Sequence, residues 1–161
     1  MTPYAQRLWL PVLTAAAAAV VVAMLGFMMT DLGPWYRQLT MPSWKPPDAL
    51  FGPAWTVIFA CAALAAAQGW RTLTRPASRF VLCGFFALNA GLNVLWSVLF
   101  FRLHQPHWAV LEVGLLWLSI VVLMFALWRG SRLASWLLLP YLLWVSYAAL
   151  LNVSVARLNP S

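Results

Sequence analysis

Charged residues are scarce in this 161-residue chain, where Asp, Glu, Lys and Arg make up only 8% of the residues. A soluble globular domain carries about 25% charged residues, whereas 64% of this chain is hydrophobic. Such a chain has too little polar surface to be held in water, so we predict an integral membrane protein. Acids are rarest of all, because Asp31, Asp48 and Glu112 are the only three.

The basic residues are few and dispersed, although they give a formal net charge of +7. They form no patch, so the sequence does not predict nucleic-acid binding. Their distribution predicts topology instead. One side carries Arg7, Arg71, Arg75, Arg79, Arg129 and Arg132, and the other carries Arg37, Lys45, Arg102 and Arg157. The positive-inside rule then places the N-terminus in the cytoplasm and, if the source is bacterial, the first loop in the periplasm.

Groups that carry common catalytic chemistry are also lacking. The chain shows no nucleophile paired with a base and no phosphate-binding loop, so no catalytic residue is predicted. His104 and His107 have no carboxylate or cysteine near them in sequence, and Cys61 and Cys83 lie apart. We therefore predict no metal site.

Long apolar runs make up most of what is present. A bilayer-spanning helix needs about 20 apolar residues, and five runs have this length: roughly 8–30, 51–70, 80–101, 108–128 and 134–156. Continuous runs favour helices over the short alternating strands of a membrane barrel. The sequence predicts an all-α bundle of five transmembrane helices, forming one domain over residues 1–161.

The one long connection, residues 31–50, is rich in proline and tryptophan. The stretch from Gly33 to Trp55 holds five of the eleven prolines and three tryptophans. Proline fixes φ and removes a backbone donor, so most of this segment cannot be helix interior. A rigid, aromatic loop between two spans is typical of a lid over a binding site.

Three spans each place aromatic and polar residues on one helical face. These stripes are Phe51, Trp55, Ile58, Phe59 and Ala62; Asn89, Asn93 and Trp96; and Tyr141, Trp144, Ala148 and Asn152. Facing inward, they would enclose a mostly apolar pocket with a few polar points, as small-molecule sites do. Bundle packing and interhelical hydrogen bonds are the alternative interpretation.

Small residues occupy the opposite face of the third span: Gly84, Ala87 and Gly91. Such residues allow close helix contact, either within the bundle or with a second subunit. Because the asparagine face is expected to line the cavity, we predict that the small face points outward and forms a homodimer interface.

Glu112 is the one acid embedded in a span. An intramembrane carboxylate is a functional hypothesis in itself. We expect it to pair with Arg102 or His107; a protonated, silent group and a ligand contact are the alternatives.

Four motifs together resemble a known family. They are W-Y-x-x-L-x-x-P-x-W-x-P-P at 35–47, G-P-A-W-T at 52–56, L-N-V-L-W-S at 92–97, and P-Y-L-L-W at 140–144 followed by L-N at 151–152. In this order and spacing they resemble the translocator protein family, also called the peripheral-type benzodiazepine receptor family, whose bacterial members are tryptophan-rich sensory proteins.

The resemblance implies a five-helix bundle, commonly a homodimer, that binds porphyrins such as protoporphyrin IX or haem beneath its first loop. It implies ligand contacts at Trp44, Trp55, Asn93, Trp144 and Ala148. With the stripes, the predicted site comprises Trp44, Trp55, Phe59, Asn93, Trp96, Tyr141, Trp144, Ala148 and Asn152.

Two departures matter. Phe59 stands where many members have a tyrosine, and Arg157 has no tyrosine within the five preceding residues. The cholesterol motif needs that tyrosine, so cholesterol binding is not expected.

The sequence thus predicts a receptor-like, porphyrin-binding membrane protein with a sensory, regulatory or transport role and no obligatory cofactor. One alternative is a transporter of porphyrins, although no internal repeat is visible. Another is light-dependent porphyrin breakdown, which the resemblance leaves open.

Overall fold

Five long helices make up most of the protein in a computed structural model, which describes residues 3–160 and the side chains from Trp9 onward. Within that part of the chain no β-strand occurs. The elements are α1 (Pro3–Met29), α2 (Pro34–Gln38), the 3₁₀ turn η1 (Asp48–Leu50), α3 (Phe51–Thr72), α4 (Pro76–Ser97), the π-helical turn η2 (Val98–Arg102), α5 (Pro106–Trp128), α6 (Arg132–Leu137) and α7 (Leu139–Leu158). The predicted all-α, five-span architecture is confirmed.

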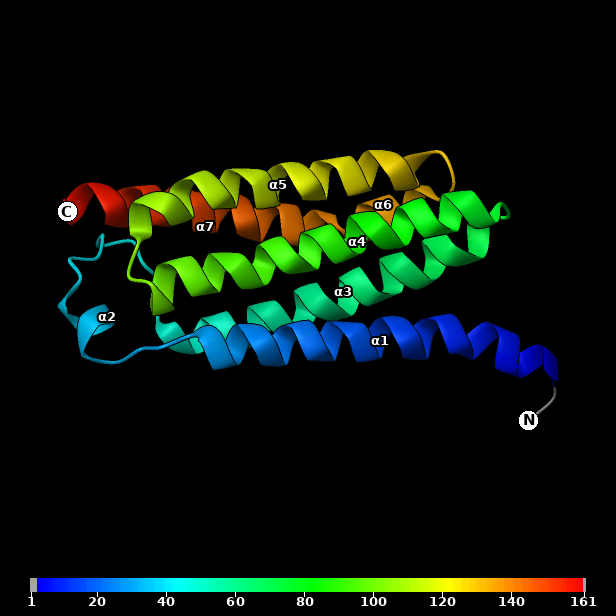
Figure 1. Cartoon of the computed structure of the whole chain (residues 1–161), viewed down its shortest axis with the longest axis horizontal. Helices are drawn as coiled ribbons and strands as arrows, with labels where there is room; N and C mark the ends of the chain where they lie inside the picture. Colours follow the sequence, from blue (N-terminus) through cyan, green and yellow to red (C-terminus); the bar gives the residue numbers. More distant parts are fainter. Residues whose placement is uncertain (1–2, 161) are drawn as a thin grey trace.

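The long helices pack side by side as a closed bundle (Figure 1). Helix α1 contacts α3 and α4, α3 contacts α6 and α7, and α5 contacts both α4 and α7. The buried core lies mainly along α5, where Leu116, Ile120 and Leu123 are almost fully enclosed. Helix α1 lies outermost, and the apolar stretch of its described side chains contains no fully buried residue.

The fifth span is interrupted, whereas the sequence predicts one continuous helix over 134–156. It consists of α6 and α7, which meet at Leu138. Pro140 lies in the first turn of α7 and has no N–H to continue the hydrogen-bond ladder from α6. The Leu138 amide instead donates to the Ser135 carbonyl over 3.1 Å, which tightens the turn.

The end of the fourth helix is widened into a π-helical turn. In η2 the Leu103 amide donates to the Val98 carbonyl, five residues back, over 2.9 Å. Phe100 and Phe101 lie in this turn, and both are buried. A π-turn of this kind often marks a functional site.

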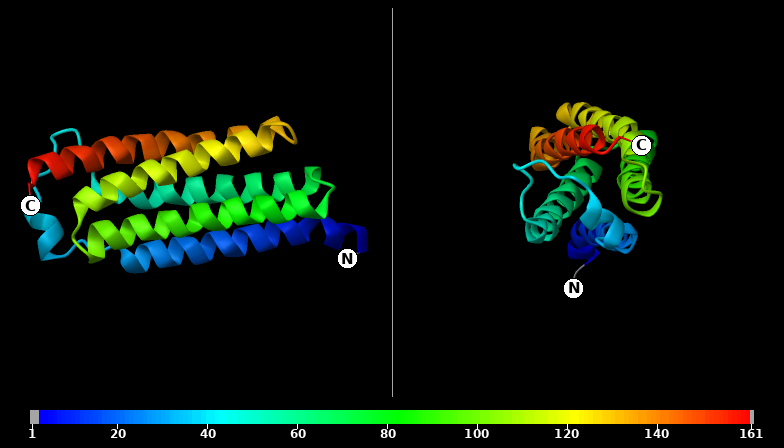
Figure 2. Two further views of the ribbon diagram at one scale, coloured as in Figure 1. Left: turned by 45° about the horizontal axis from the view of Figure 1, so that its top comes forward. Right: turned by 90° about the vertical axis from the view of Figure 1, so that its left-hand side faces the viewer.

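The two ends of the bundle differ in what they carry. The first loop, the α4–α5 connection and the C-terminus lie at one end, and the N-terminal end of α1 and the other two connections lie at the opposite end (Figures 1 and 2). The basic residues therefore divide between the ends as the topology prediction assumed. The Arg7 side chain lies outside the described part of the chain.

Candidate ligand-binding site beneath the first loop

The first loop, residues 30–50, crosses the end of the bundle and closes it (Figure 2). It includes the short helix α2, which begins at Pro34, so the predicted loop is partly helical. Its middle is tied to the end of α7 by two reciprocal bonds. The Thr40 amide donates to Asn159 Oδ1 over 2.9 Å, and Asn159 Nδ2 donates to the Thr40 carbonyl over 3.0 Å.

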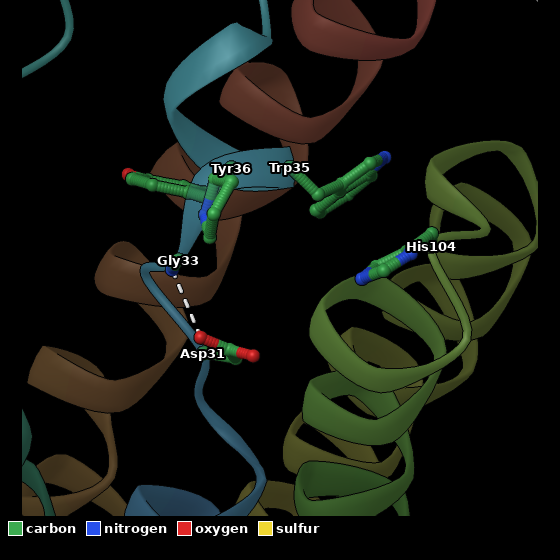
Figure 3. Close-up of a pocket in the computed structure, with 6 residues that line it drawn as sticks. Asp31, Gly33, Trp35, Tyr36 and His104 are labelled. Atoms are coloured by element: carbon green, nitrogen blue, oxygen red, sulfur yellow. Dashed lines mark hydrogen bonds between the residues drawn. The ribbon is translucent and has the colours of Figure 1, made fainter.

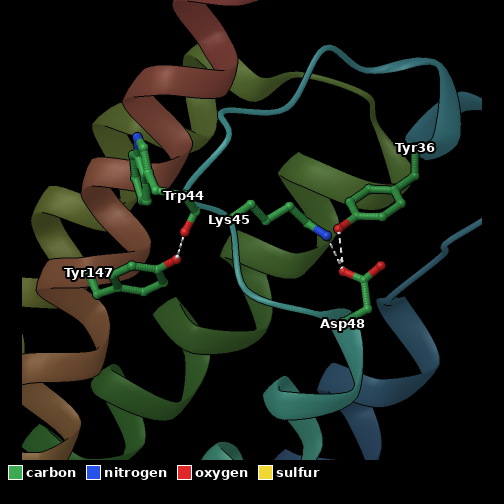
Figure 4. A network of polar contacts seen from close by, with 5 residues as sticks. All are labelled: Tyr36, Trp44, Lys45, Asp48 and Tyr147. Atoms are coloured by element: carbon green, nitrogen blue, oxygen red, sulfur yellow. Dashed lines mark hydrogen bonds and ion pairs between the residues drawn. The ribbon is translucent and has the colours of Figure 1, made fainter.

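A polar cluster holds the second half of the loop (Figure 4). Asp48 Oδ1 accepts hydrogen bonds from the Tyr36 hydroxyl over 2.9 Å and from Lys45 Nζ over 2.6 Å. Burial, reinforced by the bond to the Asp48 carboxylate, raises the pKa of Tyr36 above its usual range. The Tyr36 hydroxyl therefore stays protonated and keeps donating through the neutral pH range.

A cavity lies beneath the loop, with a volume of about 40 Å³. The loop covers it with Tyr36, Met41 and Lys45. Its walls are Phe51, Trp96, Phe100, Phe101, Ala148, Leu151, Asn152 and Val155. The lining is mostly apolar and aromatic with a few polar points, as is usual for small-molecule sites.

Three of the nine predicted site residues line this cavity: Trp96, Ala148 and Asn152. Two of them hold each other in place, because Trp96 Nε1 donates to Asn152 Oδ1 over 3.0 Å. Asn152 Nδ2 in turn donates to the Pro106 carbonyl at the start of α5 over 3.0 Å. One asparagine thus joins α4, α5 and α7 at the cavity wall.

The other predicted residues form an aromatic cluster that does not line the cavity. Trp55 stacks on Phe59 and meets Tyr141 edge-on. The Tyr141 hydroxyl accepts from Asn93 Nδ2 over 3.1 Å deep in the bundle. Trp44, Trp55, Asn93 and Trp144 do not line this cavity, so their common ligand site stays a prediction.

Trp44 and Trp144 are linked through a third aromatic residue. Tyr147 lies 5.6 Å from the Trp44 ring and 5.8 Å from the Trp144 ring, centroid to centroid. The Tyr147 hydroxyl also donates to the Trp44 carbonyl over 3.4 Å (Figure 4). Trp144 Nε1 is buried without an acceptor. These three rings connect the loop to the first half of α7.

Several residues that line the cavity are absent from the site predicted from the sequence. Phe100 lies seven residues after Asn93 and therefore on the same helical face, so extending that stripe by one turn would have included it. Phe101 lies further from that face, within the π-turn η2. Tyr36, Met41 and Lys45 lie within the predicted lid, but their spacing does not show which side chains point inward. The W-Y pair at 35–36 was the available signal for Tyr36.

A second cavity, of about 110 Å³, lies where the loop leaves α1 (Figure 3). Asp31, Gly33, Pro34, Trp35, Tyr36 and His104 line it. The His104 ring stacks on Trp35 at 4.2 Å. His104 has a φ of 55°, a left-handed conformation that costs a non-glycine residue about 1–2 kcal/mol, and its stack on Trp35 helps to offset that cost.

Glu112 is placed differently from the expectation. Its side chain is only 4% exposed, and neither carboxylate oxygen has a hydrogen-bond partner. The predicted pairing with Arg102 or His107 is wrong, because the Arg102 guanidinium reaches the Met28 carbonyl and His107 is exposed. Both of these residues lie at the end of the bundle, whereas Glu112 is more than one turn inside α5.

The small-residue face of α4 points outward. Gly84, Ala87 and Gly91 are all exposed, whereas Asn89 and Asn93 on the opposite face are buried. A Cβ atom added at Gly84 or Gly91 would meet no atom within 4 Å. This face is therefore unoccupied by the rest of the bundle.

These features define a multi-pass integral membrane protein with five spanning helices and a tryptophan-bearing loop across one end. The chain belongs to the TspO/MBR family, whose model matches residues 11–158. It is 38% identical over 154 residues to the tryptophan-rich protein TspO of Chlorobaculum tepidum, an alignment that covers 92% of this chain and 98% of the relative.

Two further relatives show how widely the architecture is shared. The tryptophan-rich sensory protein of Cereibacter sphaeroides is 32% identical over 94% of this chain and 92% of its own length. The translocator protein of Sus scrofa is 32% identical over 94% of this chain and 91% of its own length. The resemblance that the sequence motifs indicated is thereby confirmed.

Proposed function

We propose that this protein binds tetrapyrroles within the bundle, beneath the first loop, and that binding serves a sensory, regulatory or transport role. The observation that carries the proposal is the cavity lined by Trp96, Phe100 and Phe101, because flat apolar rings stack favourably on aromatic side chains. Asn152 supplies a polar point on the same wall. The names of the relatives, a sensory protein and a translocator protein, agree with a role of this kind.

The closed cavity is too small for such a ligand. Pockets for drug-sized molecules have volumes of about 300–1,000 Å³, and this one has about 40 Å³. A tetrapyrrole would have to displace the first loop and separate the neighbouring aromatic cluster. Trp44, Trp55 and Trp144 would then become accessible to it, which reconciles the predicted contacts with their present positions.

Two further features accompany this proposal. A homodimer through the exposed α4 face of Gly84, Ala87 and Gly91 would cover a surface that the bundle leaves bare. The charge distribution supports a cytoplasmic N-terminus, with the first loop on the outer side of the membrane.

The binding proposal is tested by titrating the purified protein with protoporphyrin IX and with haem while the tryptophan fluorescence is recorded. We expect saturable quenching by both, since the ligand is held by ring contacts. Ala148→Phe places a ring in the cavity and should weaken binding by roughly tenfold, equivalent to about 1.4 kcal/mol.

The matched control is Ala60→Phe, which adds the same ring on an exposed face of α3. Its affinity should equal that of the wild type. Absence of saturable quenching, or equal affinities for the two variants, would contradict a ligand site beneath the loop.

A further inference from the structure

An unpaired acid lies deep in the bundle at Glu112. Its side chain is 4% exposed, and both carboxylate oxygens are buried without a hydrogen-bond partner. Buried polar groups in proteins are nearly always hydrogen-bonded, and each exception needs an explanation. A buried charge without a partner is costly. Glu112 therefore does not stabilise the bundle, and its presence points to another role.

Helix register places Glu112 at the depth of the cavity on the α4 side. Ser119 lies seven residues, or two turns, further along α5 on nearly the same face, and its hydroxyl accepts from Asn89 Nδ2 of α4 over 2.8 Å. Helices α4 and α5 are antiparallel neighbours (Figure 1). Moving two turns back along α5, from Ser119 to Glu112, therefore corresponds to moving two turns forward along α4, from Asn89 to Trp96. Glu112 therefore faces α4 at the level of Trp96, a cavity wall residue.

The register of α5 against α7 gives the same depth independently. Asn152 bonds to the Pro106 carbonyl, and Trp117 Nε1 donates to the Ser146 hydroxyl over 2.9 Å. Between these two cross-links Glu112 lies beside the stretch of α7 that contains Ala148, another cavity wall residue. Both neighbours of α5 thus place Glu112 at the depth of the cavity, behind wall residues such as Trp96 and Ala148, although it does not itself line the cavity.

The polar groups near this position are already engaged with one another. Asn93 donates to Tyr141, Asn89 donates to Ser119, and Trp96 donates to Asn152. None of these bonds reaches Glu112, and no described side chain donates to its carboxylate oxygens. Two acceptor oxygens are therefore available to an incoming group, and an ammonium satisfies them best because it supplies both charge and several donors.

We propose that Glu112 is the polar anchor of a binding site at the inner end of this cavity for apolar ligands that carry a protonated amine. The aromatic wall receives the apolar part, and the carboxylate receives the ammonium. Because the cavity holds only about 40 Å³, the first loop and the wall residues must move aside to admit such a ligand. The inference does not require the ligand to be a tetrapyrrole.

The test uses three naphthalene probes of similar size: 1-naphthylmethylamine, 1-naphthylmethanol and 1-methylnaphthalene. Binding is measured by calorimetry at pH 7 on the full chain in phosphatidylcholine nanodiscs, and empty nanodiscs correct for partition into lipid. We expect the amine to bind between roughly tenfold and a hundredfold more tightly than the methyl probe, the range of a charge-assisted hydrogen bond.

Three variants test whether the preference for the amine probe depends on Glu112. Glu112→Gln keeps the size and one acceptor oxygen but loses the charge, and Glu112→Leu removes the polar group; both should abolish the preference for the amine. Gly114→Ala is the control, because a Cβ at this exposed position of α5 meets no atom within 4 Å. It should keep the preference. Thermal unfolding of each variant verifies that it is folded.

Equal affinity of the wild type for the amine and the methyl probe would overturn the proposal, as would a preference that survives in Glu112→Gln. Equally tight binding of the alcohol and the amine would show that the site accepts neutral donors, so the ammonium assignment would be wrong. Porphyrin binding is measured separately by fluorescence quenching. A negative result there would contradict the proposed function but would not affect the measured preference for the amine probe.

Discussion

At the scale of single residues, buried asparagines join the helices to one another. In lipid there is no water to satisfy a buried amide, so each such group must find a partner in the protein. Asn152 finds two, one on α4 and one on α5, and Asn93 finds one on α7. These bonds set the rotation of the helices around the cavity, because each aligns a particular face of one helix with its neighbour.

Replacing Asn152 by leucine should lower the stability of the protein. The change leaves Trp96 Nε1 without an acceptor, and a buried unpaired group costs about 1–3 kcal/mol. It also removes the bond from Asn152 to the Pro106 carbonyl. We expect a lower midpoint of thermal unfolding in detergent. Trp96→Phe removes the donor itself, so the double variant should lose less stability than the sum of the two single variants. Strict additivity would argue against the bond.

At the scale of elements, the first loop is the part of the protein that the proposed ligand would have to displace. Few of its residues are fully enclosed, and it is held by a small number of polar contacts at its middle and its second half. Segments with few buried contacts open most readily. The Asn159 side chain joins the middle of the loop to the end of α7, and it does not line the cavity.

Asn159→Ala should therefore open the loop without altering the site. Arg37 is exposed in this loop, and Lys45 precedes proline, so Arg37–Gln38 is the trypsin-sensitive bond of this segment. Losing two hydrogen bonds of about 1 kcal/mol each should accelerate cleavage there by roughly thirtyfold, as measured by mass spectrometry.

Ser154→Ala serves as the control, because the Ser154 hydroxyl bonds only within α7, to the Leu150 carbonyl. Its cleavage rate should match that of the wild type. Equal rates in Asn159→Ala and the wild type would show that Asn159 does not hold the loop closed.

At the scale of the whole molecule, the bundle leaves the small-residue face of α4 exposed. Small residues on the outside of α4 allow another backbone to approach closely, and the dispersion attraction between the two packed helices favours association in lipid. A symmetric pair would use the same face of α4 on both protomers.

Gly91→Leu should shift the proposed dimer toward monomer in detergent, as measured by analytical ultracentrifugation. The protomer itself should be unaffected, since a Cβ at Gly91 meets nothing within 4 Å. Gly114→Leu, at an equally open glycine of α5, should leave association unchanged. A monomeric wild type, or an intact dimer of Gly91→Leu, would contradict the assignment of this face.

The sequence by itself determined the class of the protein, because spanning a bilayer imposes length and apolarity locally on each helix. It likewise predicted the buried face of Asn89 and Asn93, and the outward face of Gly84 and Gly91, since both follow from helical periodicity. The motifs around Trp44, Trp55, Trp96 and Trp144 were sufficient to indicate the family.

Only the tertiary structure decided which side chains meet. The π-turn η2, the break at Leu138 and the isolation of Glu112 all depend on how the five helices pack together. In a bundle the register and rotation of each helix are set by its contacts with the others, and no single segment contains that information. For the same reason, the closure of the cavity by the first loop followed from Thr40 meeting Asn159, two residues far apart in the chain.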